Sequence, residues 1–219
     1  LTLGTKNLTL KSAAGITLSN TIIAGAVTIT NAGTLSVTSA GDLTLSDSFT
    51  QNGAGAVSTA GDITTTADNI SFATAVTLTG AVALDSDGGN ITFSSTVEGA
   101  QTLALDAAAG EIAFNGAVGS VPLTSVVTTG TTGTITIGQN IETTGVQTYT
   151  GPVTLSGSPT LTTADNLVTF SGDVSGAGAL SVTSGSGGLT FGSTVGAGVD
   201  ITSLSTTGTT GNITLTGNI

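Results

Sequence analysis

The strongest constraint on the fold is a repeat of about 20 residues that runs through most of the chain. Apolar positions recur with a step of 21 between residues 70 and 126 and again between 168 and 201. The step is 19 near the start, and it is 20 where SAGDL at 39–43 returns as TAGDI at 59–63. The columns with a step of 21 are Ile70, Ile91 and Ile112; Phe72, Phe93 and Phe114; Val76, Val97 and Val118; Leu84, Leu105 and Val126; Val168 and Leu189; Phe170 and Phe191; Val174 and Val195; and Leu180 and Ile201. The early columns are Leu8 and Val27, Leu10 and Ile29, Ile16 and Leu35, and Leu18 and Val37. Self-similarity at such a period is the signature of a solenoid or another repeat array.

Each repeat is built from short strands. Triplets such as Ile70-Ser71-Phe72 and Leu103-Ala104-Leu105 alternate apolar and small or polar residues at the period of a strand. Gly, Asn, Asp and Ser lie between the triplets, and these residues favour tight corners. The density of Thr, Val, Ile and Gly disfavours a helix. The pattern therefore predicts an all-β chain.

A chain of short strands and corners with this period predicts a parallel β-solenoid, in which each coil stacks on the previous one at roughly 4.8 Å. We expect 19–21 residues per coil and about 11 coils, giving a rod of about 50 Å. Residues 1–219 would form one continuous solenoid domain. The unpaired strands at both ends predict that the domain continues into further coils or associates end to end.

A longer repeat overlies the short one. The stretch ITFSSTVEG beginning at Ile91 resembles VTFSGDVSG beginning at Val168, a shift of 77 residues. In addition, TTGTTG at 128–133 recurs at 206–211, a shift of 78. We interpret this as a long repeat of about 77 residues, spanning 91–167 and beginning again in 168–219, in which four short units make one long unit.

Composition excludes several classes of protein. The mean hydropathy of +0.44, with only 7% charged residues, is too apolar for a disordered chain. No stretch approaches the roughly 18 consecutive apolar residues of a membrane span. The net charge is −11, and the only cations are Lys6 and Lys11, so we expect no nucleic-acid partner. The chain opens on Leu1, which we interpret as the start of a processed or excerpted segment.

The units GNITFSSTVEGAQTLALDAAAGEIAFNGAVG and TGTTGTITIGQNIETTGVQTYTGPVTL resemble the repeats of large bacterial exoproteins of the filamentous haemagglutinin type. The resemblance covers nearly the whole chain. It implies a single-stranded, right-handed parallel β-helix that forms the shaft of an adhesin, located at the cell surface or released outside the cell. It also implies an outer-membrane secretion partner for the full-length protein. The secretion domain of that family has no counterpart in this sequence.

Two kinds of corner residue raise the question of ligand binding or modification. Asp85-Ser86-Asp87-Gly88-Gly89-Asn90 presents oxygen atoms at alternate positions, but its glycine is two places too early for an EF-hand and no glutamate closes the loop. We interpret the stretch as an Asx-Gly corner rather than a calcium site. The tripeptides beginning at Asn7, Asn69, Asn90 and Asn212 match the glycan acceptor pattern. We expect them to be by-products of a corner followed by a strand.

Other candidate sites are also weak on the sequence alone. We expect Phe72, Phe93 and Phe114 to stack inside, whereas Tyr149 is either at the edge of the core or on the surface. Asp42 and Asp62 occupy matching AGD corners, where a glycosidase would need a designed carboxylate pair. The chain has no His or Cys. We therefore expect no catalytic, cofactor-binding or metal-binding residues and no enzymatic activity.

The sequence thus predicts a structural role. The first hypothesis is the shaft of a secreted or cell-surface bacterial adhesin or filament that supports attachment, with end-to-end or lateral self-association. The alternative is a module that binds a glycan, a host or neighbouring cell surface, or a neighbouring filament along one flank, which would need a contiguous ladder of one side-chain type. An ice-binding face is a further alternative, with Thr9 and Thr28, then Thr44 and Thr64, ranked along one side. A polysaccharide-acting enzyme is the least favoured alternative.

Overall fold

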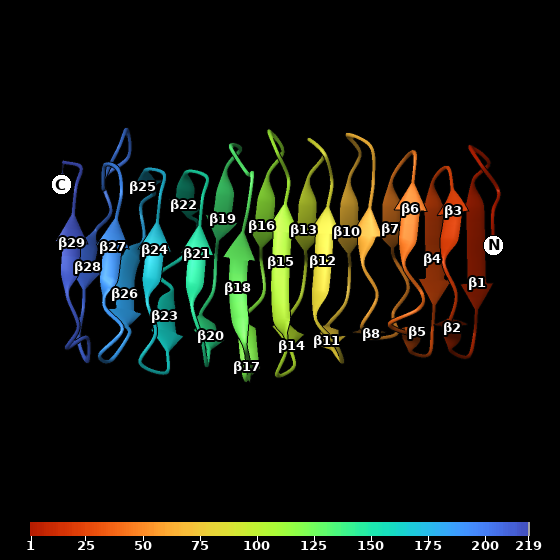
Figure 1. Cartoon of the computed structure of the whole chain (residues 1–219), viewed down its shortest axis with the longest axis horizontal. Helices are drawn as coiled ribbons and strands as arrows, with labels where there is room; N and C mark the ends of the chain where they lie inside the picture. The colour runs from red at the N-terminus through yellow and green to blue at the C-terminus, as the bar shows by residue number, and fades with distance from the viewer. Residues whose placement is uncertain (219) are drawn as a thin grey trace.

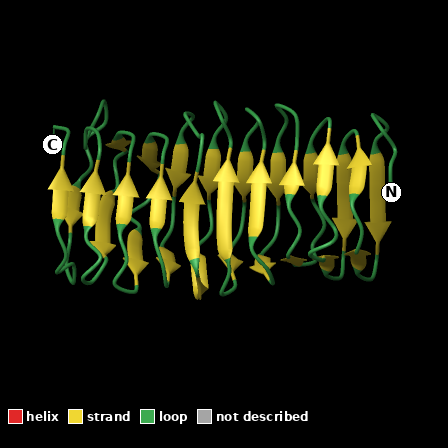
Figure 2. Ribbon diagram, in the orientation of Figure 1, coloured by secondary structure: helices red, strands yellow, loops and turns green. Residues whose placement is uncertain are grey.

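The computed structural model of the chain describes residues 1–218 and has the form of a rod (Figure 1). The two termini lie at opposite ends of the rod, and the chain winds from one end to the other. Regular structure in the described residues consists of strands joined by loops and turns (Figure 2). Residues 1–218 contain no helix long and apolar enough to cross a membrane.

Within residues 1–218 the strands form three parallel sheets that run along the length of the rod, and each coil contributes in turn to sheets 1, 2 and 3. Sheet 1 contains, in the described part of the chain, β1 (Leu8–Ser12), β4 (Val27–Asn31), β7 (Phe49–Gln51), β10 (Ile70–Phe72), β13 (Ile91–Phe93), β16 (Ile112–Phe114), β19 (Ile135–Ile137), β22 (Val153–Leu155) and β25 (Val174–Ser175). Sheet 2 contains β2 (Ile16–Leu18), β5 (Leu35–Val37), β8 (Val57–Thr59), β11 (Val76–Leu78), β14 (Val97–Glu98), β17 (Val118–Leu123), β20 (Ile141–Thr143), β23 (Thr160–Thr163), β26 (Ala179–Thr183) and β28 (Ser203–Ser205). Sheet 3 contains β3 (Ile22–Ala24), β6 (Leu43–Leu45), β9 (Ile63–Thr64), β12 (Val82–Asp85), β15 (Thr102–Asp106), β18 (Ser125–Thr128), β21 (Gln147–Tyr149), β24 (Val168–Phe170), β27 (Leu189–Phe191) and β29 (Ile213–Leu215).

The register of these sheets confirms the predicted parallel β-solenoid. Ile70 pairs with Ile91 and Ile91 with Ile112, while Phe72, Phe93 and Phe114 pair in the same order. The early columns with a step of 19 also pair as predicted. Residues 1–218 make about ten turns of about 21 residues, slightly fewer than the 11 expected, because several coils are longer than 20 residues.

Two predicted column members are wrong, because two coils have additional residues. Val126 pairs with Leu103 and not with Leu105, which instead pairs with Thr128. The coil before this point contains the irregular strand β17, whose register with β20 shifts between Val118 and Leu123. Leu180 likewise pairs with Leu204 and not with Ile201. A constant step of 21 fails wherever a bulge or a longer loop lengthens the circuit.

The long repeat does not correspond to four stacked coils. The stretch that starts at Ile91 forms β13 in sheet 1, whereas its sequence match at Val168 forms β24 in sheet 3. The two strands are eleven strand positions apart, from β13 to β24, and each coil has three strands, so the shift spans three coils and two thirds of a fourth. The interpretation of four units per long repeat was therefore wrong. The match arises because both sheets use the same strand, with a β-branched residue and a phenylalanine facing inward.

The interior is a narrow apolar column that contains two aromatic stacks. In sheet 1 the ring centroids of Phe72 and Phe93 are 5.5 Å apart at 5°, and those of Phe93 and Phe114 are 5.6 Å apart at 3°. Phe49 extends this stack with a tilted ring 5.3 Å from Phe72. The second stack, in sheet 3, joins Tyr149 to Phe170 and Phe170 to Phe191 at 5.2 and 5.1 Å. All of these rings are buried, which confirms the prediction for Phe72, Phe93 and Phe114.

Tyr149 belongs to the core. Its side chain is completely buried, and its hydroxyl donates a 3.0 Å hydrogen bond to Oε1 of the buried Gln147. The Gln147 Nε2 group donates to the carbonyl oxygen of Thr162 at 2.9 Å. Burial raises the pKa of Tyr149, because the phenolate would lose its hydration. The hydroxyl thus remains a neutral donor, and the amide provides the partner that a buried tyrosine needs.

Candidate functional site

The asparagines of the predicted acceptor tripeptides connect successive coils. The Asn69 Oδ1 atom accepts a hydrogen bond from the Asn90 amide at 2.8 Å, and Asn90 Oδ1 accepts one from the Glu111 amide at 2.9 Å. Asn7 makes the equivalent contact with the Ala26 amide at 3.0 Å. Each side chain therefore occupies a backbone donor at a corner. The positions agree with the interpretation as a corner followed by a strand, with Ile91 buried directly after Asn90.

The AGD corners use their carboxylates in the same way. Asp42 Oδ1 accepts from the Asp62 amide at 2.9 Å, and Asp62 Oδ1 accepts from the Ala83 amide at 2.7 Å. The two aspartates lie one coil apart, as the repeat predicted. Each carboxylate bonds to the backbone of the next coil, which is the geometry of a corner that repeats rather than of a converging acid and base.

A third corner of this kind was not identified from the sequence. Asp173 Oδ1 accepts hydrogen bonds from the Ser193 hydroxyl at 2.6 Å and from the Thr194 amide at 3.0 Å. These two bonds, led by the one from Ser193, lower the pKa of the Asp173 carboxyl against a small opposing effect of desolvation. The sequence signal was the Asp that precedes a strand at the corner position, as in the AGD units.

The stretch from Asp85 to Asn90 forms a corner with internal hydrogen bonds. Asp85 Oδ1 accepts from the Asp87 amide at 3.0 Å, and the buried Ser86 hydroxyl donates to the Gly89 carbonyl at 2.6 Å. Asp85 pairs in register with Asp106, which makes the same contact with the Ala108 amide. Both aspartates line a shallow hollow of about 190 Å³. Among residues 1–218 no three His, Cys, Asp or Glu side chains come together in a group that could hold a metal ion.

Two buried amide side chains form a polar cluster at the corner between sheets 1 and 2. Gln51 Nε2 donates to Asn31 Oδ1 at 2.8 Å, and Asn31 Nδ2 donates to the Gly33 and Gly55 carbonyls at 2.7 and 3.0 Å. Both residues are at most 1% exposed. Sequence reasoning missed them, although alignment of the coils would have shown that Gln51 stands in the inward position that Phe72 occupies in the next coil. The cluster is fully hydrogen-bonded, and its donors and acceptors serve the chain itself.

The outward side chains of sheet 1 form a nearly continuous row of hydroxyl groups. We call this surface the sheet 1 outer face. It consists of the outward residue of each strand, Thr9, Thr28, Thr50, Ser71, Thr92, Ala113, Thr136, Thr154 and Ser175. Thr44 and Thr64 pair with each other in sheet 3. The expectation that they rank with Thr9 and Thr28 along one side was therefore wrong, because it did not resolve which strands share a sheet.

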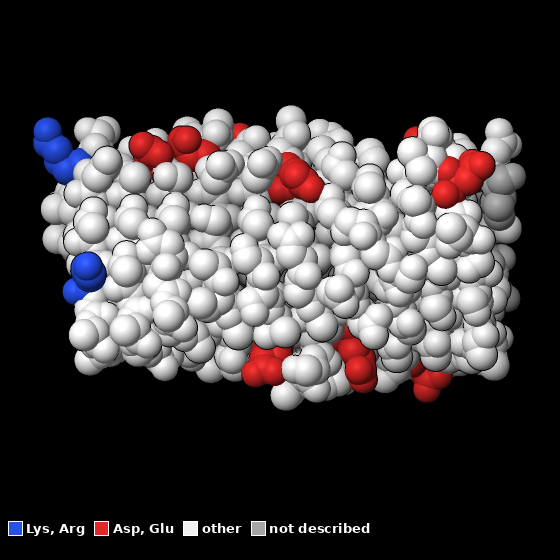
Figure 3. Space-filling view, turned by 180° about the vertical axis from the view of Figure 1, so that it is seen from behind, with Lys and Arg blue, Asp and Glu red and all other residues white. Residues whose placement is uncertain are grey.

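Charge is distributed unevenly among the three sheets. In the described strands of sheet 1 the only ionisable side chain is Lys11, whereas sheet 2 carries Glu98 and Glu142 and sheet 3 carries Asp85 and Asp106. The view from behind shows carboxylates toward the upper and lower edges and the two lysines at the N-terminal end (Figure 3). The band between them carries little charge.

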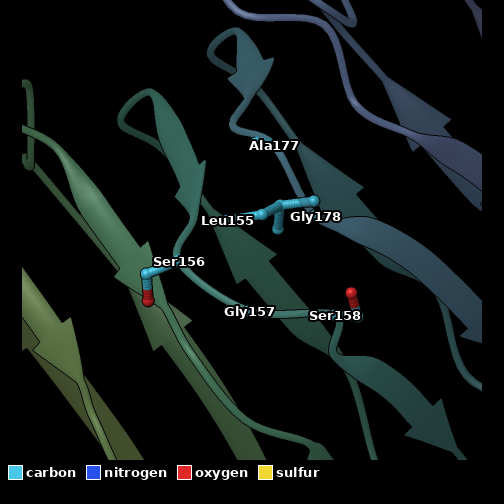
Figure 4. A pocket seen from close by; sticks show the side chains of 6 residues that line it. All are labelled: Leu155, Ser156, Gly157, Ser158, Ala177 and Gly178. Carbon is cyan, nitrogen blue, oxygen red and sulfur yellow. The ribbon is translucent and has the colours of Figure 1, made fainter.

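Concave sites on the rod are shallow. One hollow of about 160 Å³ lies near the corner that joins β22 to β23 and is lined by Leu155, Ser156, Gly157, Ser158, Ala177 and Gly178 (Figure 4). The Ser158 hydroxyl oxygen accepts a 3.1 Å hydrogen bond from the Ala179 amide. The lining contains two hydroxyls and no ionisable group. The hollow offers neither a general base nor a charged anchor for a substrate.

Comparison with protein-family models, curated proteins and solved structures found no match for this chain.

Proposed function

We propose that this chain is the shaft of a secreted or cell-surface bacterial adhesin or filament. The observation that carries the proposal is the in-register stacking of coils from one end of the rod to the other. Backbone hydrogen bonds join each coil to the next along three sheets, and the core side chains stack in the same direction. A rod of this kind holds its two ends at a fixed separation, which a flexible linker does not.

The resemblance to filamentous haemagglutinin-type repeats supports the same proposal. It also underlies the proposed extracellular location and the outer-membrane secretion partner of the full-length protein. The corner residues fit this role, because the side chains of Asn90, Asp62 and Asp173 bond to neighbouring coils. A shaft needs such connections and needs no converging catalytic groups.

Replacement of the chain in the cell that produces it tests this function. We expect attachment to be lost when residues 1–218 are replaced by a flexible Gly/Ser linker of the same number of residues, because the linker does not hold the ends apart. An unrelated β-solenoid with the same number of coils should restore attachment. If the unrelated solenoid fails while the native chain succeeds, the role is not that of a shaft, and the outward residues themselves bind a partner.

The second candidate function, a lateral binding module, is favoured by one observation. The sheet 1 outer face is a contiguous ladder of one side-chain type, as this alternative requires. Hydroxyl groups both donate and accept hydrogen bonds, so such a ladder suits an uncharged polar ligand. In the replacement experiment above, failure of the unrelated solenoid is the result that this candidate predicts.

A further inference from the structure

The charge distribution limits how two copies of this chain approach each other. With a net charge of −11, each copy repels the other. Contact through sheet 2 brings Glu98 and Glu142 toward the partner, and contact through sheet 3 brings Asp85 and Asp106 toward it. Contact through sheet 1 brings hydroxyl groups together instead, because Lys11 is the only ionisable group in its described strands. Sheet 1 is thus the face with the smallest electrostatic penalty.

Hydroxyl groups of this face are free to bond to a partner. Within residues 1–218 the structure has no hydrogen bond from the side chains of Thr28, Thr50, Thr92 or Thr154, all of which are half-buried. A hydroxyl is both donor and acceptor, so a row of identical hydroxyls is complementary to a second copy of itself. Such self-complementarity is the requirement for a two-fold symmetric interface.

The dimensions of the face set the strength of the contact. Nine strands in the described chain give a length of about 43 Å at about 4.8 Å per strand. With a width of about 13 Å, full overlap of two copies buries about 1,000 Å² in total, at the lower end of specific interfaces. The contact would therefore be weak for this chain, and it would strengthen with every additional coil.

Aromatic residues exclude the most obvious competing occupant. The six phenylalanines and the single tyrosine are all at most 2% exposed, so none lies on the sheet 1 outer face. A face that binds sugar rings ordinarily offers aromatic platforms. We infer that the sheet 1 outer face pairs with the same face of a second copy of this chain, in full overlap, and so joins shafts side by side. This goes beyond the shaft role, since a single rod performs that role without a lateral partner.

Sedimentation at several protein concentrations tests the inference. We expect the wild-type chain to form dimers whose fraction rises with concentration and with salt, because salt screens the repulsion between copies. A variant with Thr50→Glu, Thr92→Glu and Thr154→Glu should weaken dimerisation by about tenfold or more. The matched control carries Ser58→Glu, Thr77→Glu and Thr162→Glu in sheet 2, adds the same charge at half-buried outward positions, and should dimerise far better.

A second test does not depend on the folding of the triple variants. The chain has no cysteine, so a single Thr92→Cys substitution in β13, the middle strand of sheet 1 in the described chain, introduces a unique thiol. With full overlap, the two thiols meet at the symmetry axis, and a short bis-maleimide should join them much faster than it joins Thr77→Cys in sheet 2. Equal rates for the two variants, a monomeric wild type at all concentrations, or equal loss of dimer in both triple variants would each overturn the inference. A wild type that is monomeric yet is retained by an insoluble neutral glucan through Thr92 would overturn it in favour of a glycan partner. Small-angle scattering of the monomer reports the rod separately, so failure of pairing and failure of the shaft proposal are distinguishable.

Discussion

At the scale of single residues, the periodic positions were predictable and the solitary ones were not. Phe72, Phe93 and Phe114 share one inward column, and a repeated position on the same side of a strand leaves no choice but the interior. Tyr149 had no repeated tyrosine to compare with, and its burial depends on Gln147, which provides the hydrogen-bond partner. Such pairing of two unlike residues leaves no periodic signal in a sequence.

Removal of a ring from the middle of the sheet 1 stack should be severely destabilising. Phe93→Ala opens a cavity between Phe72 and Phe114, and we expect it to lower the free energy of unfolding by about 3–5 kcal/mol. Phe93→Leu should cost less, because leucine fills much of the space. Chemical denaturation checks both values, with the neighbouring outward substitution Thr92→Ala as control. A loss for Phe93→Ala no larger than for Thr92→Ala would contradict a packed stack.

The corner amides predict a different pattern of substitution effects. Asn90→Ala leaves the Glu111 amide without its acceptor and should lower the free energy of unfolding by about 1–2 kcal/mol. Asn90→Asp keeps an acceptor oxygen in the same place, as Asp62 does at its own corner, and should retain most of the stability. Urea denaturation of the two variants at neutral pH distinguishes them. Equal losses would show that the contact from Asn90 Oδ1 does not stabilise the corner.

At the scale of elements, strands were easier to predict than coil lengths. The alternation within each triplet marks inward and outward positions directly, and the observed strands follow it. The length of a coil depends on its loops, and β17 adds residues without changing the apolar pattern on either side. The misplaced partners of Leu105 and Leu180 both follow from such additions.

Close contacts between corners predict which glycines are required. A Cβ atom on Gly55 would lie 1.9 Å from the carbonyl oxygen of Gly33 in the previous coil, whereas one on Gly138 would approach only the Ser156 hydroxyl, at 3.0 Å. Because backbone cannot move aside as a side chain can, Gly55→Ala should cost about 1–3 kcal/mol or more. Gly138→Ala should be close to neutral. Thermal unfolding of the two variants checks this, and similar melting temperatures would mean that the coils separate more easily than their spacing indicates.

At the scale of the whole molecule, the solenoid was predictable because every coil repeats the same statement of the fold. The arrangement of its three surfaces was not. Assigning Thr28 and Thr44 to different sheets requires the count of strands in each coil, and the match between Ile91 and Val168 points to the wrong count. The outward surface of sheet 1, on which the inference of pairing rests, therefore became visible only when the strands were in register.

Modularity of the rod gives the last prediction. Deleting residues 70–90 removes β10, β11 and β12 and joins Asn69 to Ile91, so that one complete coil is lost and Asn69 takes the corner position of Asn90. Because stability in a stacked array is close to a sum over neighbouring repeats, we expect a soluble, cooperatively folded chain with a urea m value lower by about one-tenth. Deleting residues 80–90 removes fewer residues but takes away only the sheet 3 strand of that coil, so every later strand is displaced by one sheet. Circular dichroism and urea denaturation should show the shorter deletion to be far more damaging than the longer one. The reverse order, or equal damage, would mean that the coil is not the unit from which this rod is assembled.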